Sequence, residues 1–337
     1  MCKKLIVSDL KFLLTEIKKD IIGPKVFYAD SGAKYINWFD NFWLEEFIKF
    51  NFPNAKLDKF CFCSVDGKRP KFDKNDERIK IFYTIENLEK IVKHDKCIID
   101  KSANIFRWLA YAQKHYSDYM VNDVNVSLCF KNLSHVNYIK FPYWLITLFP
   151  HDITYTKIKE TVYTINKSQN YAEKEAICIN RHDVFGQRKK ICDDLSGILN
   201  ITYAGKWRNN TDELWNKFNN DKYSYMRLFK FNICPENMDA ADYCTEKIFD
   251  ALRCGCIPIY AGCLNNPEPE IINKDFVIFW DLDGDNTEQL KLVKRLNSDN
   301  EFYKKFVNQP KLNSNAADYI AEYFENLKQK LKELIKI

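Results

Sequence analysis

Short apolar runs alternate with segments of helical spacing along the chain, first over residues 26–149 and again over residues 176–280. Such alternation is typical of α/β proteins, whose strands and helices pack in layers around an apolar core. The first series predicts strands at residues 26–29, 34–38, 59–63, 79–83 and 126–130, a helix at 41–50 and an aromatic run at 138–149. A further helix is predicted to begin after Ser8 and to stop at Gly23-Pro24. Residues 88–125 are irregular and indicate an insertion.

The second series is more regular than the first. It predicts strands at residues 176–180, 201–204, 228–234, 256–260 and 276–280, and helices at 184–195, 212–218 and 245–254. Short apolar strands that are separated by helices are the pattern of a parallel sheet with both faces covered. Ligands of such sheets bind beyond the carboxyl ends of the strands.

A chain of 337 residues has room for two domains. We expect an N-terminal α/β domain over residues 1–165, a Rossmann-like domain over 166–312 and a C-terminal helix over 313–337. The apolar stripe of that helix is formed by Ile320, Tyr323, Phe324, Leu327, Leu331 and Leu334, and its last turns carry Lys328, Lys330, Lys332 and Lys336. Two interpretations stay open: the helix packs on the protein, or it docks on a membrane surface.

Composition narrows the possible functions. The net charge is +5, with both signs interspersed, so nucleic-acid binding, which needs a concentrated basic stripe, is not supported. A small anionic ligand stays open, and the 15% of aromatic residues could fill the core or stack on rings. The twelve cysteines are not spaced like zinc ligands and are expected to be reduced, buried thiols. No apolar segment approaches the ~18 residues of a transmembrane helix and no signal peptide is evident, so we expect a cytoplasmic protein.

No catalytic metal is expected. The five histidines are too scattered along the chain to form a ligand set. The acidic run from Asp281 to Asp285 is similar to the opening of a calcium loop, but Gly284 comes two residues early and no glutamate stands at the twelfth position. This run is therefore predicted to be a turn.

The most informative segment covers residues 229–262, which predict a strand, a polar loop, a helix, a tight turn and a second strand. Thr245 is a good N-cap for the helix, and Gly255 suits its C-terminal end. Lys247 places a cation in the first turn, where the helix dipole is already positive, at a cost of a few tenths to ~1 kcal/mol. Either Lys247 pairs with Asp250 on the surface, or it holds an anion such as phosphate together with the helix N–H groups.

This segment resembles the donor-binding motif of the α-1,3/1,4-fucosyltransferases, glycosyltransferase family ten. The elements that carry the resemblance are Glu236-Asn237, then Tyr243-Cys244-Thr245-Glu246-Lys247, then Pro258-Ile259-Tyr260-Ala261-Gly262. Their order and spacing agree with the family. Pro235, Met238 and Ala261 depart from its usual residues, which leaves open a transferase that uses another nucleotide sugar.

Two further segments resemble the family more locally. Residues 176–195 are similar to its strand and helix bearing an arginine that contacts the donor pyrophosphate, and Arg188 takes that place. From the residues alone, the favoured interpretation is that Arg188 belongs to a solvated run with Lys189 and Lys190. Residues 78–89 resemble a strand that ends before the proposed general base, which falls on Glu86, although a loop glutamate could also cap nearby N–H groups.

The resemblance implies a GT-B architecture, in which two Rossmann-like domains face a cleft. It implies inverting transfer of L-fucose from GDP-fucose to a hydroxyl of an oligosaccharide acceptor, typically O3 of N-acetylglucosamine in a lactosamine-type glycan, without a cofactor or essential divalent metal. By this resemblance Glu86 is the base, and the donor-binding residues are Arg188, Glu236, Asn237, Tyr243, Thr245, Glu246 and Lys247. Bacterial members of the family often carry basic C-terminal helices that contact the membrane. A homologue that binds glycans without catalysing transfer is the alternative to an enzyme.

Overall fold

The computed structural model describes Leu14 and residues 25–36, 38, 42–64, 72–73, 75–88, 118–170, 172, 174–183 and 185–335. The chain divides into two compact units, one formed by Met1–Pro142 with Glu325–Ile337 and the other by Tyr143–Phe324. The helix predicted after Ser8 and most of the expected insertion lie outside the described residues.

The first unit contains a six-stranded sheet. Its strands are β1 (Val26–Tyr28), β2 (Lys34–Ile36), β3 (Phe60–Ser64), β4 (Ile79–Tyr83), β5 (Val126–Cys129) and β6 (Tyr138–Lys140), in that spatial order. Neighbouring strands are parallel, except that β1 is antiparallel to β2. The five predicted strands are confirmed to within two residues at each end, as is the predicted helix, α2 (Trp43–Asn51), which is followed by the short turn η1 (Leu57–Lys59). β3 is buried along its whole length, which explains why its sequence does not alternate between apolar and polar residues.

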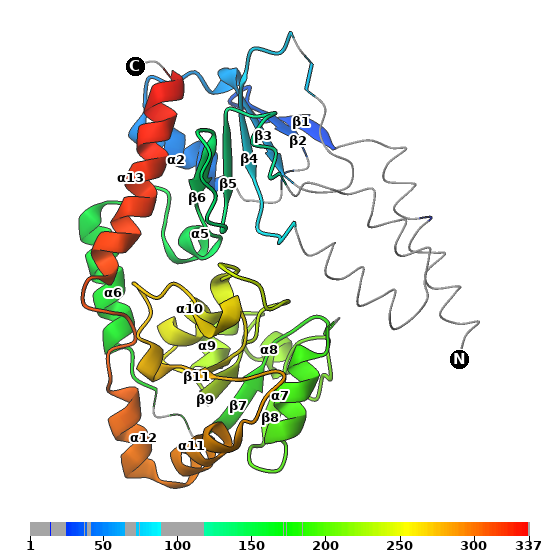
Figure 1. The fold of residues 1–337 in the computed structure, drawn as a ribbon, viewed down its shortest axis with the longest axis vertical. Coiled ribbons are helices and arrows are strands. Elements are labelled where there is room, and N and C mark those ends of the chain that lie inside the picture. The colour runs from blue at the N-terminus through cyan, green and yellow to red at the C-terminus, as the bar shows by residue number, and fades with distance from the viewer. Residues whose placement is uncertain are drawn as a thin grey trace. The chain divides into compact units, whose positions relative to one another are not determined.

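The second unit contains a five-stranded sheet in which every pair of neighbours is parallel, as predicted. Its strands are β7 (Lys174–Cys178), β8 (Ile201–Tyr203), β9 (Phe229–Ile233), β10 (Ile257–Tyr260) and β11 (Ile278–Phe279), in the spatial order β11-β10-β9-β7-β8 (Figure 1). Each lies within two residues of its predicted bounds. The central strand β9 pairs with β7 on one side and β10 on the other, so its carboxyl end lies in the middle of the sheet edge.

Helices cover this sheet and extend beyond it. They are α5 (Trp144–Leu148), α6 (Tyr155–Lys167), α7 (Gln187–Leu195), α8 (Glu213–Asn216), α9 (Lys222–Met226), α10 (Glu246–Arg253), α11 (Thr287–Ser298), α12 (Asn300–Val307) and α13 (Ala316–Ile335), with the short turns η2 (Cys263–Asn265) and η3 (Lys274–Phe276). α7 and α9 contact β9, whereas α10 contacts β10 as well as α5 and α6. The predicted start of α7 at residue 184 is too early, because Gly186 has a positive φ of 77° and ends the preceding loop.

The two units meet in the sequence between Pro142 and Tyr143, earlier than the expected boundary after residue 165. α5 and α6 contact α10, and this packing groups them with the second sheet. At the C-terminus the division passes through α13 and groups Glu325–Ile337 with the first unit. The predicted C-terminal segment over residues 313–337 is thus shared between the two units.

Most of the apolar stripe of α13 is buried, whereas Tyr323 and Leu334 are half-buried. Ile320, Phe324, Leu327 and Leu331 are at most 2% exposed. Lys328 pairs with Glu325, and Lys330 lies 3.6 Å from Glu333. Of the two interpretations of this helix, the structure shows the packed one. Across the described residues, no helix combines the length and the apolar character needed to cross a membrane.

Candidate functional site

Two loops diverge at the topological switch point of the second sheet. The loop after β7 leads to α7 and on to β8 on one side, whereas the loop after β9 leads to α10 and on to β10 on the other. Parallel α/β sheets bind ligands where successive connections part in this way, beyond the carboxyl ends of the strands. Arg188 in the first turn of α7 and the loop over residues 234–245 stand at this point.

Glu236 is the buried centre of the loop after β9. Its backbone N–H donates to the carbonyl of Ala261 at 2.9 Å, and the residue is 0% exposed. Its Oε1 accepts hydrogen bonds from the N–H of Thr245 at 2.7 Å and from the Tyr260 hydroxyl at 3.3 Å. Its Oε2 accepts from the Thr245 hydroxyl at 2.7 Å and from Lys247 Nζ at 3.0 Å. Because an ionised carboxylate has about four acceptor sites, these four donors occupy it fully.

Thr245 stands at the N-cap position of α10, as predicted, but its hydroxyl does not cap the helix. The hydroxyl donates to Glu236 and accepts from Lys247 Nζ at 2.6 Å. Hydrogen bonds to charged groups are stronger than a bond to a neutral N–H group, so the Thr245 hydroxyl bonds to the buried Glu236–Lys247 ion pair instead of capping the helix. The predicted N-cap position of Thr245 is therefore confirmed, but its side chain makes no capping hydrogen bond.

The anionic groups that pair with Lys247 are carboxylates of the protein itself. Its ammonium contacts Glu236, with Glu246 3.7 Å away, whereas Asp250 pairs with Lys222 at 2.6 Å. The surface pair between Lys247 and Asp250 is thus excluded. Burial lowers the pKa of Lys247, but the carboxylates of Glu236 and Glu246 outweigh it, so the net pKa is raised and the side chain is firmly cationic.

Arg188 is buried rather than solvated, with 4% of its surface exposed. Its Nη2 donates to Asn237 Oδ1 at 2.6 Å, and its Nη1 donates to the carbonyl of His182. Within the part of the chain that the structure describes, its Nε is buried and has no hydrogen-bond partner. Arg188 is also close enough to Lys247 to oppose the protonation of that lysine. Two cations therefore gather at the switch point, and one of their donor groups has nothing to bind.

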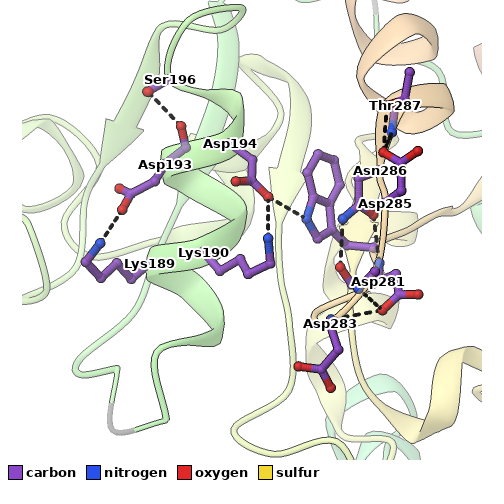
Figure 2. A network of polar contacts seen from close by, with 12 residues as sticks. Lys189, Lys190, Asp193, Asp194, Ser196, Asp281, Asp283, Asp285, Asn286 and Thr287 are labelled. Atoms are coloured by element: carbon purple, nitrogen blue, oxygen red, sulfur yellow. Dashed lines mark hydrogen bonds and ion pairs between the residues drawn. The ribbon is translucent and has the colours of Figure 1, made fainter.

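The neighbouring lysines of α7 behave differently from Arg188. Figure 2 shows Lys189 and Lys190 pairing along the helix with Asp193 and Asp194, and the second pair spans 3.1 Å. The charge run of this helix thus splits into one buried arginine and two surface ion pairs.

Two residues that sequence reasoning missed hold the diverging loops in place. Asp183 accepts hydrogen bonds from the N–H groups of Arg188 at 3.2 Å and Lys189 at 2.7 Å, and so caps α7. The amide of Gln187, in the orientation that satisfies its hydrogen bonds, donates to the carbonyl of Glu236 at 2.7 Å and accepts from the N–H of Asp239 at 3.0 Å. An aspartate just before a helix was an available capping signal, whereas nothing in the sequence marked Gln187.

The remaining predicted donor residues lie in the same loop and helix start. Asn237 accepts from Arg188, Tyr243 is buried with its N–H donating to the carbonyl of Ala240 at 3.1 Å, and Glu246 is the first residue of α10. Burial raises the pKa of Glu246, but the charges of Lys247 and Lys222 together with hydrogen bonds from its own N–H and from Thr245 outweigh it, so the net pKa is lowered. The structure therefore brings together all seven predicted donor residues.

Glu86, the predicted base, belongs to the first unit and follows β4. It is half-buried, and its backbone N–H donates to Thr84 Oγ1 at 3.1 Å. Elsewhere in the first unit, Glu45 is buried, with Tyr35 donating to it and Lys49 at 2.9 Å, whereas Glu46 is half-buried. The role of Glu86 as general base is inferred from its position just past the end of a parallel strand, and it stays a prediction.

The acidic run after β11 is a turn, as predicted. Asp281 Oδ1 accepts from the N–H groups of Asp283 at 2.9 Å and Gly284 at 2.8 Å, and Asn286 bonds both backbone groups of Asp281 (Figure 2). The carboxylate of Asp281 is thus used to hold the loop. Trp280, which precedes it, donates its indole N–H to Asp194 at 3.2 Å and so ties this turn to α7.

Solved structures share this fold. A crystal structure of an α1,3-fucosyltransferase with GDP-fucose aligns with a TM-score of 0.50 and 18% identity over 87% of this chain and 88% of that one. The same class of protein with GDP aligns with a TM-score of 0.51 and 17% identity over 88% and 89%. The chain therefore has the predicted α/β fold of the GT-B type, with one parallel sheet and one sheet that is parallel except for β1.

A family model matches most of the second unit. Residues 167–315 match the family model described as glycosyltransferase family 10 (fucosyltransferase) C-term, which confirms over this segment the resemblance seen in the sequence. The α-(1,3)-fucosyltransferase FucT of Helicobacter pylori is 30% identical over 145 residues, 42% of this chain and 28% of that protein. "Putative fucosyltransferase R654" of Acanthamoeba polyphaga mimivirus is 23% identical over 322 residues, 90% of this chain and 46% of that protein. The chain thus spans less than half the length of these two relatives.

Proposed function

We propose that this protein transfers L-fucose from GDP-fucose to a hydroxyl of an oligosaccharide, with inversion at the anomeric carbon. The observation that carries the proposal is the pair of cations at the switch point, Arg188 and Lys247, with a buried Nε of Arg188 that has no partner among the described residues. A diphosphate supplies the acceptors that such a pair requires. The match to a fucosyltransferase family model and the likeness to a structure with GDP-fucose support fucose as the sugar.

In the proposed reaction the acceptor oxygen bonds to the anomeric carbon of fucose while the bond from that carbon to the phosphate oxygen breaks. Glu86 takes the proton of the attacking hydroxyl. GDP departs with the bonding electron pair, and the charge that develops on its terminal phosphate is stabilised by Arg188 and Lys247. Fixed cations can provide this stabilisation without a metal ion. Asn237, Tyr243 and Glu246 orient the nucleotide and the sugar.

For the acceptor, we propose O3 of N-acetylglucosamine in a lactosamine-type glycan. This assignment is supported by the names of the similar proteins, which are α-1,3-fucosyltransferases. N-acetyllactosamine is therefore the acceptor to test first.

Thermal unfolding with nucleotides in the presence of EDTA tests the donor assignment. At ~100 times Kd, a ligand that binds only the native state adds ~2.7 kcal/mol to the free energy of unfolding. We expect GDP and GDP-fucose to raise Tm, GDP-mannose to raise it less and UDP-galactose not to raise it. The same samples, incubated with GDP-fucose and N-acetyllactosamine, should yield a fucosylated product. A Tm that responds to neither GDP nor GDP-fucose would refute the proposed donor, and selective stabilisation by another nucleotide sugar would replace it.

A further inference from the structure

Glu236 occupies the place of a donor-binding residue in the sequence motif, but the structure leaves it no freedom to bind a donor. The side chain is fully buried, and four protein donors from three sources surround its two oxygens: Thr245, Lys247 and Tyr260. A ligand could reach this carboxylate only by displacing one of them.

We propose that Glu236 is a positioning residue, a buried carboxylate that aims the ammonium of Lys247 at the diphosphate of the donor and does not itself touch the donor. The inference rests on the proposed function, since it assumes that Lys247 binds a diphosphate. It goes beyond that function in assigning Glu236 to the lysine rather than to the sugar or the nucleotide.

The hydrogen bonds of Lys247 define the direction in which it points. An ammonium carries three protons. Two of these protons are donated in hydrogen bonds to atoms of the protein, Glu236 Oε2 at 3.0 Å and Thr245 Oγ1 at 2.6 Å. The side chain is 19% exposed, so the third proton is the one that remains for a ligand. Glu236 therefore fixes a flexible four-carbon side chain in one orientation before the ligand arrives, which reduces the entropy lost on binding.

The charges around Lys247 show why an anion is needed behind it. Burial opposes the protonation of Lys247 most strongly, and the charge of Arg188 on α7 acts in the same direction. Glu236 and Glu246 favour the charged ammonium. Cys234 and Tyr260, which also face this cluster, have pKa values raised by burial and are neutral near pH 7. Of the two carboxylates, only Glu236 is fully buried and hydrogen-bonded to Lys247, so its removal should allow the ammonium to lose its proton at a lower pH.

The test compares GDP affinity between pH 7.0 and 9.0 in the wild-type protein and in Glu236→Gln. The ratio of the two affinities at each pH cancels the ionisation of GDP itself. We expect the variant to bind GDP about tenfold more weakly at pH 7.0, and the ratio to widen by a further tenfold by pH 9.0 as Lys247 deprotonates. A ratio that stays constant with pH would overturn the proposal. So would a variant that keeps wild-type GDP affinity and loses only affinity for GDP-fucose, because Glu236 would then contact the sugar.

Two matched variants separate positioning from simple stability. Glu236→Asp keeps the charge and should keep the ratio to wild type constant with pH, even if its affinity is lower. Asp250→Asn removes another buried, ion-paired carboxylate of the same region and should lower Tm without changing the pH dependence of GDP binding. If Asp250→Asn changed that dependence as much as Glu236→Gln, the effect would not be specific to Glu236.

A direct measurement on the wild-type protein covers the case in which Glu236→Gln does not fold. Reductive methylation, followed by mass spectrometry as a function of pH, reports the protonation and accessibility of individual lysines. Lys247 should be methylated much more slowly than the surface residue Lys189 up to pH 9. Methylation of the two lysines at the same rate would contradict the proposal. A wild-type protein that binds no GDP but shows a protected Lys247 would instead refute the proposed function and leave the Glu236–Lys247 pair intact.

Discussion

Gly262 lies so close to Glu236 that a β-carbon built on the glycine would stand 2.7 Å from Glu236 Cγ and 2.8 Å from its Cβ. The backbone at Gly262 also has a φ of 147°, which L-residues with side chains rarely adopt. The final glycine of the strand motif is therefore required by the glutamate of the loop before it. The two ends of the segment over residues 229–262 are linked sterically as well as by the hydrogen bonds around Glu236.

Gly262→Ala should be destabilising and should weaken nucleotide binding. The added methyl group has to displace Glu236, and overpacking of this kind typically costs 1–3 kcal/mol. Urea unfolding and GDP titration measure the two effects. Gly197→Ala is the control, because a β-carbon there meets nothing within 4 Å and its φ is not in the positive range. Equal stability of the two alanine variants would show that Glu236 moves aside easily.

The sequence could predict the strands because each is a short apolar run between turn residues. The sequence prediction missed α6, although its buried residues Ile158, Val162 and Ile165 recur at i, i+4 and i+7, which is helical spacing. A second signal was present at Thr154, whose side chain accepts from the N–H of Lys157 and caps the helix. Packing against α10, which the sequence does not reveal, groups this helix with the second unit.

The candidate site was predictable in its members but not in their roles. Motif spacing identified Glu236, Thr245 and Lys247 together, yet all three looked like ligand contacts. Which side chain faces a ligand and which supports another depends on burial, and burial at a loop is decided by tertiary packing. Arg188 shows the same limit, because its sequence neighbours are surface lysines while its own side chain is buried.

Replacing Lys311 should stabilise the protein in a pH-dependent way. Lys311 is 0% exposed, its Nζ donates to the carbonyl of Val307 at 3.3 Å and lies 4.8 Å from the ring centre of Phe276, and no described carboxylate pairs with it. Burial lowers its pKa to about 8 from 10.5. Below pH 8 the lysine is charged in both the folded and the unfolded protein, and the folded protein is destabilised by the full cost of burying the charge. Between pH 8 and 10.5 the unfolded chain binds more protons, so stability rises with pH and the penalty disappears.

Lys311→Met should therefore raise Tm at pH 7, and the gain should shrink as the pH rises from 8 to 10. Differential scanning fluorimetry at several pH values measures the change. Lys305→Met is the matched control, since this exposed lysine lies on the neighbouring helix α12 and should shift Tm little at any pH. If Lys311→Met raised Tm as much at pH 10 as at pH 7, the pKa of Lys311 would not be lowered in the folded protein.

The packed stripe of α13 predicts a structural role for the end of the chain. Leu331 is 0% exposed, and truncating a buried leucine to alanine typically costs 2–5 kcal/mol. Leu331→Ala should lower the free energy of unfolding by this amount, whereas the exposed neighbour Lys332→Ala should change it little. Deleting residues 328–337 should likewise lower Tm and leave sedimentation with anionic vesicles unchanged. Loss of vesicle binding without a loss of stability would support membrane docking instead.

The sharpest prediction separates the proposed base from the donor-binding residues. Glu86→Gln keeps the shape of the side chain but removes the proton acceptor, so turnover should fall by about 10²–10⁴-fold, the usual contribution of general-base catalysis. GDP affinity should stay close to that of the wild type, because Glu86 lies in the first unit and Lys247 in the second. Lys247→Ala should weaken GDP binding and turnover together, since it removes a charge-assisted contact that strengthens as the leaving group departs.

Initial rates of fucose transfer to N-acetyllactosamine, measured beside GDP titrations for both variants, give the comparison. Lys222→Ala is a useful control for the loss of a cation near α10, because its ammonium pairs with Asp250 and not with Glu236. If Glu86→Gln kept near wild-type turnover, the base would have to be another carboxylate of the first unit. Glu46 would then be tested before Glu45, because Glu45 is buried and already binds Tyr35 and Lys49, whereas the side chain of Glu46 is 41% exposed and pairs with Lys49.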